Sequence, residues 1–399
     1  MAEEAPQPIS LPDPPTDGIT GLSFLGATTL LASTSWDGSV RIHDIGSEQQ
    51  LGKDAKLQVS HSHKVGPLLS LACREDDGSG VAASSNASSS SNHVLYTGAL
   101  DGSVHAFDVA SNTLTKVGQH KAPETNDKNS ATAAACSSVA LLPPLVVTAG
   151  WDRHLYVWDV RQDNSAQAAV SVDLPGKAFC MDVDPLHSRV AIGCSGRQTC
   201  LVDVRRPDQT VTAELGLQGE SSQKHQTRCL RFFPDGQRIA VGSVEGRVAV
   251  EWVDGRPLEN GQGMPKEYAF KCHRRNDLVF PVNAIEFHPK YGTFATGGGD
   301  GTVGELRFCV LHVDVSTDYP CNHFSHFSEI VTWDGFNRKR LTALPAFATS
   351  VAALAFNHDG SVLAMASSYT FEEGERDHPR DEIFVRRMLD TDCQPKTKS

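Results

Sequence analysis

Short runs of alternating apolar and polar residues recur along the chain, and tight turns separate them. In residues 30–44, one such run ends at Trp36, the turn pair Asp37-Gly38 follows, and a second run begins at Ser39. Alternation with a period of two predicts β-strands with one buried face, and an Asp-Gly pair predicts a hairpin turn between them. The chain should therefore be rich in short antiparallel strands.

The same strand-turn-strand phrase returns several times, which is the signature of a repeat fold. Close copies occupy residues 94–108 and 146–159, and another begins at 293; weaker copies cover 190–203, 239–252 and 362–385. A further strand precedes most copies, which completes one blade of a WD-repeat β-propeller. We predict an all-β fold, a single propeller of about seven blades over residues 17–390. A β-sandwich with chance repeats would not explain why the Trp-Asp phrase recurs with its flanks.

Segments outside the repeats have separate interpretations. The alternation in residues 7–11, within the N-terminal segment 1–16, predicts a closing strand beside the last strand at 383–387, which would remove an exposed sheet edge. Residues 76–92 and 124–138 have the composition of solvated loops, and residues 391–399 are expected to form a flexible tail.

One copy of the repeat is interrupted. The copy that begins at 293 breaks after Val303, and residues 331–341 resume the pattern; joining Val303 to Val331 restores a complete repeat. Our hypothesis is that residues 304–330 are a translated intron. The alternative is a genuine loop, whose apolar and aromatic residues would be costly to expose.

Composition limits the classes of function. The net charge of -12 repels nucleic-acid backbones, so direct binding of nucleic acid is disfavoured. The acidic, Pro-rich N-terminus differs from a secretory leader, no apolar run reaches membrane length, and the ten cysteines form no CxxC pair. We expect a soluble intracellular protein with reduced thiols.

Candidate catalytic and metal-binding residues have plainer explanations. The turn aspartates Asp37, Asp101, Asp152 and Asp300 recur at one place in the blade, so turn geometry explains them better than catalysis. The pair His61 and His63 lacks a third ligand, which favours solvated loop histidines over a metal site. With no Gly-rich phosphate loop and no nucleophile elbow, we expect neither an enzyme nor a cofactor.

From residue 226 onward the sequence resembles a known family. The residues that carry this likeness are Gln226 to Cys229, Glu245 to Glu251, Tyr268 to Arg274, Pro281 to Ile285, Ala366 to Tyr369, His378-Pro379 and Ile383 to Arg386. They resemble the WD-repeat propellers of the mitotic spindle checkpoint known as the third Bub protein, over residues 17–396. A sister family, the messenger-RNA export propeller of the nuclear pore, shares the Phe-Lys-Cys-His-Arg block, but residues 248–251 and the ending from His378 to Ile383 favour the checkpoint branch.

The resemblance implies a non-enzymatic scaffold of the spindle assembly checkpoint. Its partners would be checkpoint kinases and kinase-like proteins bound through GLEBS motifs, phosphothreonine repeats on a kinetochore scaffold, and the checkpoint complex that inhibits a ubiquitin ligase. Its location would be the nucleus and, in mitosis, the kinetochore. The alternative is an export adaptor that binds a nucleoporin GLEBS motif, which the acidic net charge disfavours. A propeller hydrolase would need clustered acid, base or metal groups, and the sequence offers none.

Six residues are candidates for these contacts. The family pattern assigns phosphothreonine to Arg228 and Arg247, because two guanidinium forks match a dianionic phosphate. Alternatively, each arginine only pairs with a neighbouring carboxylate. Trp36 and Trp151 precede turn aspartates and could anchor a partner peptide or pack between blades, whereas Trp158 belongs to the core. Beside His273, Lys271 and Arg274 either extend the peptide surface or staple strand ends.

Overall fold

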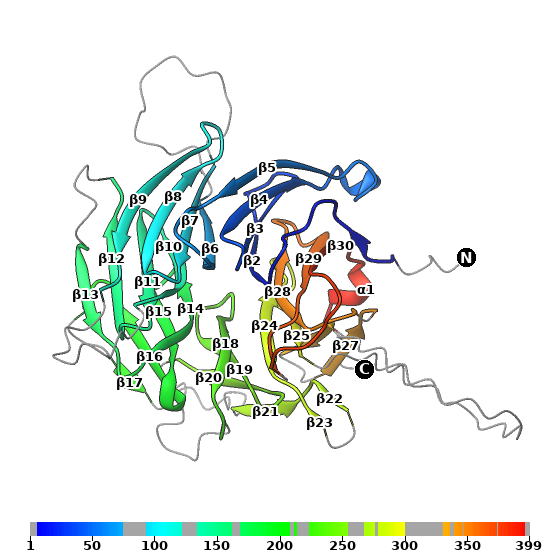
Figure 1. Ribbon diagram of the computed structural model, residues 1–399. Coiled ribbons are helices and arrows are strands. Elements are labelled where there is room, and N and C mark those ends of the chain that lie inside the picture. The colour runs from blue at the N-terminus through cyan, green and yellow to red at the C-terminus, as the bar shows by residue number, and fades with distance from the viewer. Residues whose placement is uncertain are drawn as a thin grey trace, which may run out of the picture.

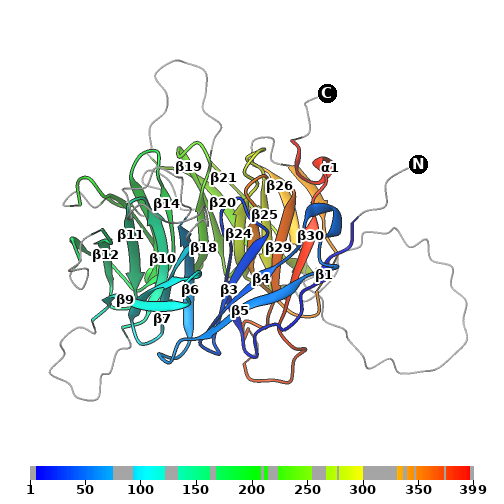
Figure 2. The same ribbon diagram turned by 90° about the horizontal axis from the view of Figure 1, so that it is seen from above.

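The computed structural model is a β-propeller of seven four-stranded antiparallel sheets arranged around one axis (Figure 1; Figure 2). The prediction of an all-β, seven-bladed fold is therefore confirmed. An additional two-stranded hairpin and one short α-helix complete the fold. The structure describes residues 6–74, 93–121, 134–161, 168–207, 211–213, 223–253, 267–275, 278–299, 330–335, 339–345, 347–372 and 374–395.

The first three blades follow one another along the chain, each with its first strand innermost and its fourth strand outermost. Blade I contains β2 (Ile19–Phe24), β3 (Leu30–Ser35), β4 (Ser39–Asp44) and β5 (Lys56–Ser62), with a 3-10 turn η1 (Glu48–Gln50). Blade II contains β6 (Leu68–Arg74), β7 (Val94–Ala99), β8 (Ser103–Asp108) and β9 (Thr113–Gln119). Blade III contains β10 (Cys136–Leu142), β11 (Leu145–Gly150), β12 (His154–Asp159) and β13 (Val170–Asp173).

The remaining blades repeat this order. Blade IV contains β14 (Ala178–Asp184), β15 (Arg189–Cys194), η2 (Ser195–Arg197), β16 (Gln198–Asp203) and β17 (Val211–Ala213). Blade V contains β18 (Thr227–Phe232), β19 (Arg238–Ser243), β20 (Arg247–Trp252) and β21 (Tyr268–Lys271), and the hairpin of β22 (Arg274–Arg275) and β23 (Leu278–Val279) follows. Blade VI contains β24 (Val282–Phe287), β25 (Phe294–Gly298), β26 (Ile330–Asp334) and β27 (Lys339–Ala343). Blade VII contains β28 (Val351–Phe356), β29 (Val362–Ser367) and β30 (Glu382–Arg387) together with β1 (Ile9–Ser10) from the N-terminus.

The N-terminal strand closes the ring, as predicted. In β1, Ile9 lies opposite Val385 and Ser10 opposite Phe384, and the backbone N–H of Leu11 donates to the Ile383 oxygen at 2.8 Å. Leu11 is buried in the cluster that joins blades VII and I. The two end segments of the chain thus share one blade, in which the N-terminal strand covers an edge that would otherwise be exposed.

Apolar residues from neighbouring blades fill the spaces between the sheets. Between blades I and II, for example, Leu25, Ala32, Leu68 and Leu95 form one buried cluster. A single blade could not bury both of its faces, so each sheet depends on its two neighbours. Within the described ranges, no helix is long and apolar enough to span a membrane.

The predicted bounds of one loop and of the C-terminal tail are wrong. Residues 136–138, assigned to a loop, lie in β10, where Cys136 is fully buried. Residues 391–395 do not form a free tail, because α1 (Asp390–Cys393) packs Cys393 into the cluster between blades VI and VII. The Thr332 hydroxyl donates to the Asp392 backbone oxygen at 2.8 Å and fixes the helix to blade VI. Apart from residues 134–138, the two predicted loops lie in parts of the chain that the structure does not describe.

The interrupted repeat is completed by β26. Trp333, Thr332 and Val331 lie opposite Phe294, Ala295 and Thr296, which is the register obtained by joining Val303 to Val331. Ile330 is fully buried opposite Gly297, so it belongs to the strand and not to the predicted insert. Residues 304–329 and Val303 lie outside the described residues, and their origin as an intron stays a hypothesis.

Candidate peptide-binding face

The seven innermost strands line a central channel, and all of them carry the same irregularity near its mouth. In each strand the pairing register shifts between the first and the third residue, a bulge that leaves the second residue without a register partner. These seven second residues line a cavity of about 220 Å³. They are Thr20, Leu69, Ser137, Phe179, Arg228, Asn283 and Ala352. Arg228 is the only cation among them.

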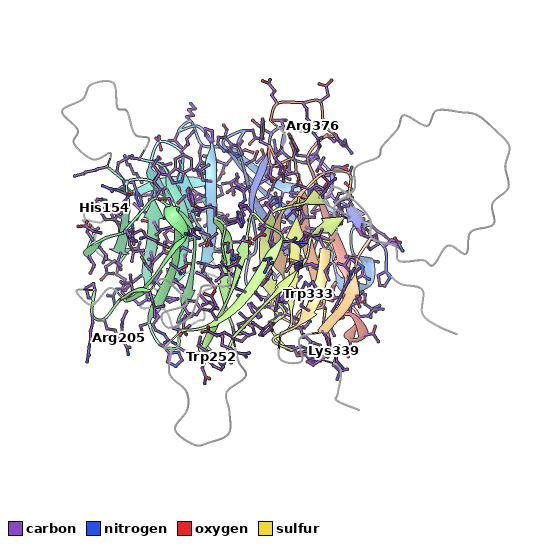
Figure 3. The ribbon with its side chains drawn as sticks, turned by 90° about the horizontal axis from the view of Figure 1, so that it is seen from below. His154, Arg205, Trp252, Trp333, Lys339 and Arg376 are labelled. Atoms are coloured by element: carbon purple, nitrogen blue, oxygen red, sulfur yellow. The ribbon has the colours of Figure 1, made fainter. Side chains whose placement is uncertain are left out.

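The mouth of the channel opens on one face of the propeller, which we call the turn face. It carries the turns between the second and third strands of each blade and the connections from each blade to the next. Figure 3 shows Arg376 on this side and Arg205, Trp252 and Lys339, which lie near connections between third and fourth strands, on the opposite side. Because β18 and β20 both begin at this face, Arg228 and Arg247 lie at the same end of blade V.

Arg228 is exposed at the channel mouth and is held by an amide. Its Nε donates to Oδ1 of Asn283 at 3.2 Å, and the Nδ2 of Asn283 donates to the Thr370 hydroxyl at 3.3 Å. No carboxylate pairs with Arg228 in the part of the chain that the structure describes. Its Nη atoms therefore remain available for an anion.

A second arginine lies deeper in the channel, and acids surround it. Nε of Arg231 donates to Glu286 at 3.1 Å, and Nη1 lies 4.0 Å from Asp182. Burial raises the pKa of both carboxyl groups, although Arg231 acts against that shift. These three residues were not predicted, although all are fifth residues of innermost strands, at one level of the channel. Two carboxyl groups face the single charge of Arg231, so this level of the channel offers no unpaired positive charge, in contrast to Arg228 at the mouth.

Arg247 differs from Arg228 because an acid lies beside it. Its Nε is 3.7 Å from Oε2 of Glu245, and no hydrogen bond reaches this Nε from the described residues. The same carboxylate lies 3.4 Å from Nε2 of His225. The expected pairing with a neighbouring carboxylate is thus present for Arg247 and absent, among described residues, for Arg228. The two arginines share one end of the blade but have separate contacts.

Lys271 and Arg274 have different roles. Arg274 donates from Nη2 to the Glu245 backbone oxygen at 2.7 Å and from Nε to the Gly246 oxygen at 3.3 Å, so it staples the turn before β20. Lys271 is exposed at the end of β21, opposite Arg247 in the register. Of the two interpretations left open by the sequence, stapling applies to Arg274, and Lys271 remains a candidate surface contact.

The two candidate tryptophans both lie in turns of this face. Trp36 is 43% exposed and packs beside Gly18. Trp151 is only half-buried, but its Nε1 is buried and has no hydrogen-bond partner among the described residues. Trp36 is thus accessible as an anchor, whereas Trp151 combines partial packing with an unused donor.

Exposed apolar side chains gather on the turn face. The described residues include seven large apolar side chains that are exposed, and six of these lie in its turns, in its connections or at the channel mouth. Leu186, in the turn between β14 and β15, is the exception. The six are Trp36, Phe179, Val244, Leu278, Val279 and Phe371. An apolar rim around a cationic mouth is suited to a peptide that carries both apolar groups and an anion.

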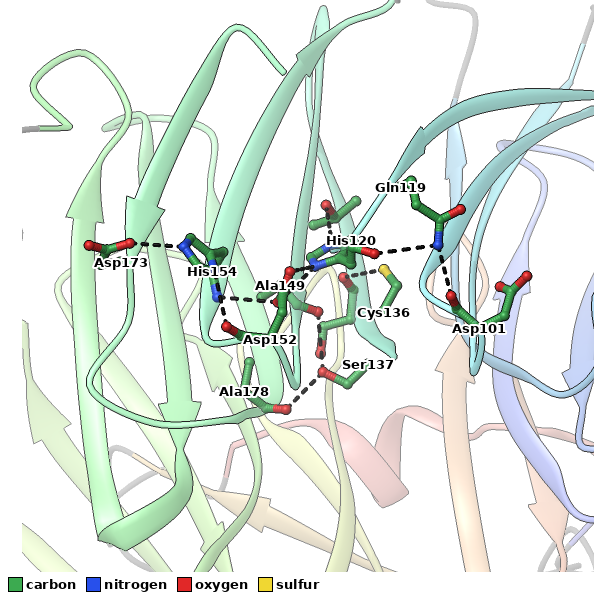
Figure 4. Close-up of polar contacts among 12 residues, drawn as sticks. Asp101, Gln119, His120, Cys136, Ser137, Ala149, Asp152, His154, Asp173 and Ala178 are labelled. Atoms are coloured by element: carbon green, nitrogen blue, oxygen red, sulfur yellow. Dashed lines mark hydrogen bonds and ion pairs between the residues drawn. The ribbon is translucent and has the colours of Figure 1, made fainter. Parts of the chain in front are cut away.

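The turn aspartates and buried histidines support the blades. Asp152 contacts Nδ1 of His120 (Figure 4), at a distance of 3.0 Å. Nε2 of His120 and Nε1 of Trp158 both contact the Thr148 hydroxyl, at 2.8 and 2.9 Å. Trp158 is buried, as expected for a core residue. This chain of contacts across blades II and III was not predicted.

Turn geometry accounts for the other described aspartates. The backbone N–H of Ser39 donates to Asp37 at 2.8 Å, and that of Ser103 donates to Asp101 at 2.9 Å. These contacts and the 3.3 Å bond from His154 to Asp152 confirm the predicted side-chain to backbone bonding. Asp300 lies outside the described residues.

The expectation of solvated histidines is wrong for His63. This side chain is 2% exposed between blades I and II, with its ring 5.9 Å from that of His105, and neither ring nitrogen is hydrogen-bonded to a described residue. Burial, with the nearby His105 and His61, lowers its pKa to about 4. No group of three or more His, Cys, Asp or Glu residues in the described ranges could hold a metal ion.

Comparison with known proteins places the chain in a family. A family model described as WD40, "WD domain, G-beta repeat", matches residues 7–44 and 266–304. Mitotic checkpoint protein bub3 of Dictyostelium discoideum is 36% identical over 381 residues, which cover 94% of this chain and 93% of the relative. This chain belongs to the Bub3 family. Its fold is accordingly a WD-repeat propeller of the mitotic-checkpoint type.

Further relatives include both checkpoint propellers and mRNA-export propellers. Mitotic checkpoint protein BUB3.1 of Arabidopsis thaliana is 34% identical over 97% of this chain and 95% of its own length. The mRNA export factor GLE2 of Chaetomium thermophilum is 30% identical over 97% of this chain and 92% of its own length. The checkpoint relatives have the higher identity, and the export propellers are a related group.

Proposed function

We propose that this Bub3-family propeller is a non-enzymatic scaffold of the spindle assembly checkpoint that binds phosphothreonine peptides and GLEBS segments on its turn face. The observation that carries the proposal is Arg228, an exposed cation at the channel mouth with no carboxylate partner among the described residues. Arg247 and Lys271 lie at the same end of blade V and add positive charge. Local charge of this kind lets a protein with a net charge of -12 bind an anion.

The partners follow from the same face. The apolar rim that includes Trp36 and Phe371 would receive a long partner segment such as a GLEBS motif, because aromatic side chains are effective anchors. Phosphothreonine repeats of a kinetochore scaffold would bind through Arg228 and Arg247. Bound checkpoint kinases and kinase-like proteins would then be recruited to kinetochores, and the propeller would join the checkpoint complex that inhibits a ubiquitin ligase.

The phosphate site is tested by replacing both Arg228 and Arg247 with Ala. Each charge-assisted hydrogen bond contributes on the order of 1.5–3 kcal/mol, so loss of both arginines should weaken binding of a phosphothreonine peptide by more than about a hundredfold in calorimetry, which abolishes it in practice. A GLEBS peptide should still bind, because its contacts spread over many residues. Arg205→Ala, an exposed arginine on the opposite face, is the matched control. Equal affinity of the wild type for phosphorylated and unphosphorylated peptide would refute the site.

The second candidate function is an export adaptor, which the export-factor relatives support. Such an adaptor would bind a nucleoporin GLEBS segment at the same face. A pull-down from mitotically arrested cells separates the two: checkpoint kinases or nucleoporins would be recovered. Recovery of nucleoporins alone would favour the export function over a checkpoint scaffold that acts in the nucleus and at kinetochores.

A further inference from the structure

A loop on the turn face reaches the channel mouth beside Arg228. It connects β29 to β30 and is held by its own contacts: the Tyr369 hydroxyl donates to the Gly374 oxygen at 2.8 Å, and the Arg376 guanidinium lies 4.7 Å from the Tyr369 ring centre. The Ser350 hydroxyl donates to Glu372 at 2.9 Å and ties the loop to blade VII. Thr370 follows Tyr369 directly and lies two residues before Glu372, so both anchors fix its place.

Thr370 is joined to Arg228 through one amide. Its hydroxyl accepts from Nδ2 of Asn283 at 3.3 Å, while Oδ1 of Asn283 accepts from Nε of Arg228 at 3.2 Å. Two hydrogen bonds and the width of an amide separate the hydroxyl from the guanidinium by on the order of 9 Å at most. A phosphate on Thr370 would extend towards Arg228, whose side chain is long and exposed. The two groups could then meet without any change of fold.

We propose that Thr370 is a phosphorylation site and that its phosphate binds the Arg228 guanidinium of the same chain. This contact blocks the channel mouth to phosphothreonine peptides. The part concerning peptides rests on the proposed function, whereas the modification and the contact with Arg228 do not. The device would make the propeller carry its own competitor for the site.

The sequence around Thr370 indicates the class of kinase. Glu372, Glu373 and Glu375 follow the threonine, a pattern suited to kinases that read acidic residues on the C-terminal side. Thr370 is half-buried, its neighbour Phe371 is 60% exposed, and residues 368–372 belong to no strand. In the reaction, Oγ1 of Thr370 bonds to the γ-phosphorus of ATP, the bond from that phosphorus to the β–γ bridging oxygen breaks, and ADP leaves. The hydroxyl proton passes to the catalytic base of the kinase.

Electrostatics favours the closed arrangement after modification. At present the Thr370 hydroxyl donates to Glu372, a bond that a phosphate without a proton cannot make. The phosphate, with a charge of about -1.5 to -2, would be repelled by Glu372 and attracted by Arg228. Because the phosphate is attached to the same chain, its effective concentration at Arg228 would be in the millimolar range.

The first experiment tests the modification and the contact. The full-length chain is incubated with ATP and a casein-kinase-type, acid-directed kinase, and phosphate is located by mass spectrometry. Phosphate should appear on Thr370, should be lost in Thr370→Val and should remain in Thr113→Val, a control at an exposed threonine of β9. In ³¹P NMR, the phosphate pKa, ordinarily about 6, should be lowered and should rise again in Arg228→Ala. An unmodified Thr370, or the same pKa with and without Arg228, would overturn the proposal.

The second experiment measures the effect on the peptide site. Phosphorylated and unphosphorylated chains are compared for binding of a phosphothreonine peptide, and the modified chain should bind roughly tenfold or more weakly. Treatment with a phosphatase should restore the affinity. Unchanged affinity of a chain known to carry phosphate on Thr370 would contradict the closure. If the unmodified chain does not bind the peptide at all, the proposed function fails, and the NMR result still decides whether the phosphate contacts Arg228.

Discussion

Arg274 holds the Glu245 turn by its backbone: Nη2 of Arg274 lies 2.7 Å from the Glu245 oxygen, and the same Nη2 lies 3.7 Å from the Glu245 carboxylate. The hairpin after blade V is thereby connected to the turn that presents Arg247. The sequence left two roles open for Arg274, and the structure gives it the structural one. Loss of Arg274 should therefore affect the stability of the turn more than the binding of any ligand.

Replacing Arg274 with Ala should destabilise blade V. The substitution removes two hydrogen bonds to backbone oxygens, and bonds from a charged donor contribute on the order of 1.5–3 kcal/mol. Urea unfolding should therefore show a fall in the free energy of unfolding of about this size. Lys271→Ala is the matched control and should leave the unfolding midpoint unchanged. The stapling role is wrong if both variants unfold alike.

Two turn aspartates should differ in their effect on stability. Asp152→Ala leaves Nδ1 of the buried His120 without its hydrogen-bond partner, which should cost up to about 3 kcal/mol of unfolding free energy. Asp101→Ala removes the contacts to Ser103. His63, which occupies the place in blade I that His120 occupies in blade II, has no hydrogen bond to a described residue. The free energy of unfolding should therefore fall by only about 1 kcal/mol. Chemical denaturation of both variants measures the difference. Equal losses would show that the chain of contacts in blade III adds nothing.

Glu251 should make stability depend on pH. Burial, with a smaller effect of Glu267, raises its pKa from 4.5 to about 8 in the folded state. The folded protein then binds more protons than the unfolded chain between about pH 4.5 and 8. The free energy of unfolding should fall across this window as pH rises, by up to about 1.4 kcal/mol per unit. Glu251→Gln should flatten this slope in denaturation measured at several pH values, whereas Glu48→Gln at the surface should not.

Removing residues 1–16 should open the ring. The deletion takes away β1, the bond from Leu11 to Ile383 and the 2.8 Å contact from Nε of Arg386 to the Pro6 oxygen. We expect the melting temperature to fall by several degrees, because several contacts are lost and each 1 kcal/mol corresponds to roughly 1 °C in a chain of 399 residues. Calorimetry provides the test, and removal of residues 1–5 alone is the control. An unchanged melting temperature for the longer deletion would mean that the strand does not hold the ring closed.

Deleting residues 304–330 should leave the fold intact. The deletion places Val303 where Ile330 now lies opposite Gly297, so one β-branched residue replaces another in the register. Loop-closure entropy changes by only about 0.6 kcal/mol per doubling of length, so the melting temperature should be equal or slightly higher. Sequencing of the mature transcript should show the codons of Val303 and Val331 adjacent. A melting temperature lowered by several degrees would show that the segment is a genuine structural element.

The sequence predicted the blades well because each depends on local rules. The phrase around Asp37-Gly38 specifies a turn and two alternating strands wherever it recurs, and stacking follows from the need to bury both faces. Even the register of β26 could be anticipated, because Val331, Thr332 and Trp333 continue the phrase that precedes the interruption.

Features that depend on distant parts of the chain were not predicted. The short polar sequence of α1 gives no helical pattern, and the burial of Cys393 depends on the space between blades VI and VII. Arg228 lies at the channel mouth because of a bulge in β18. The sequence of β18 alone does not predict this bulge, although it recurs in all seven innermost strands. His120 could have been found, because it directly follows the fourth strand of its blade, as His63 does in blade I.

The pairing of β1 with β30 also determines how the ring would respond to tension. The two strands are antiparallel, so the N-terminal end of β1 lies beside the C-terminal end of β30. A force that pulls these ends apart would open the ladder like a zipper, loading its hydrogen bonds one after another instead of all together. On the C-terminal side, α1 would first have to leave blade VI, where Asp392 and Cys393 accept bonds from Thr332 and Thr293. Blade VII is therefore the expected point of mechanical failure, and the helix resists that failure on the C-terminal side.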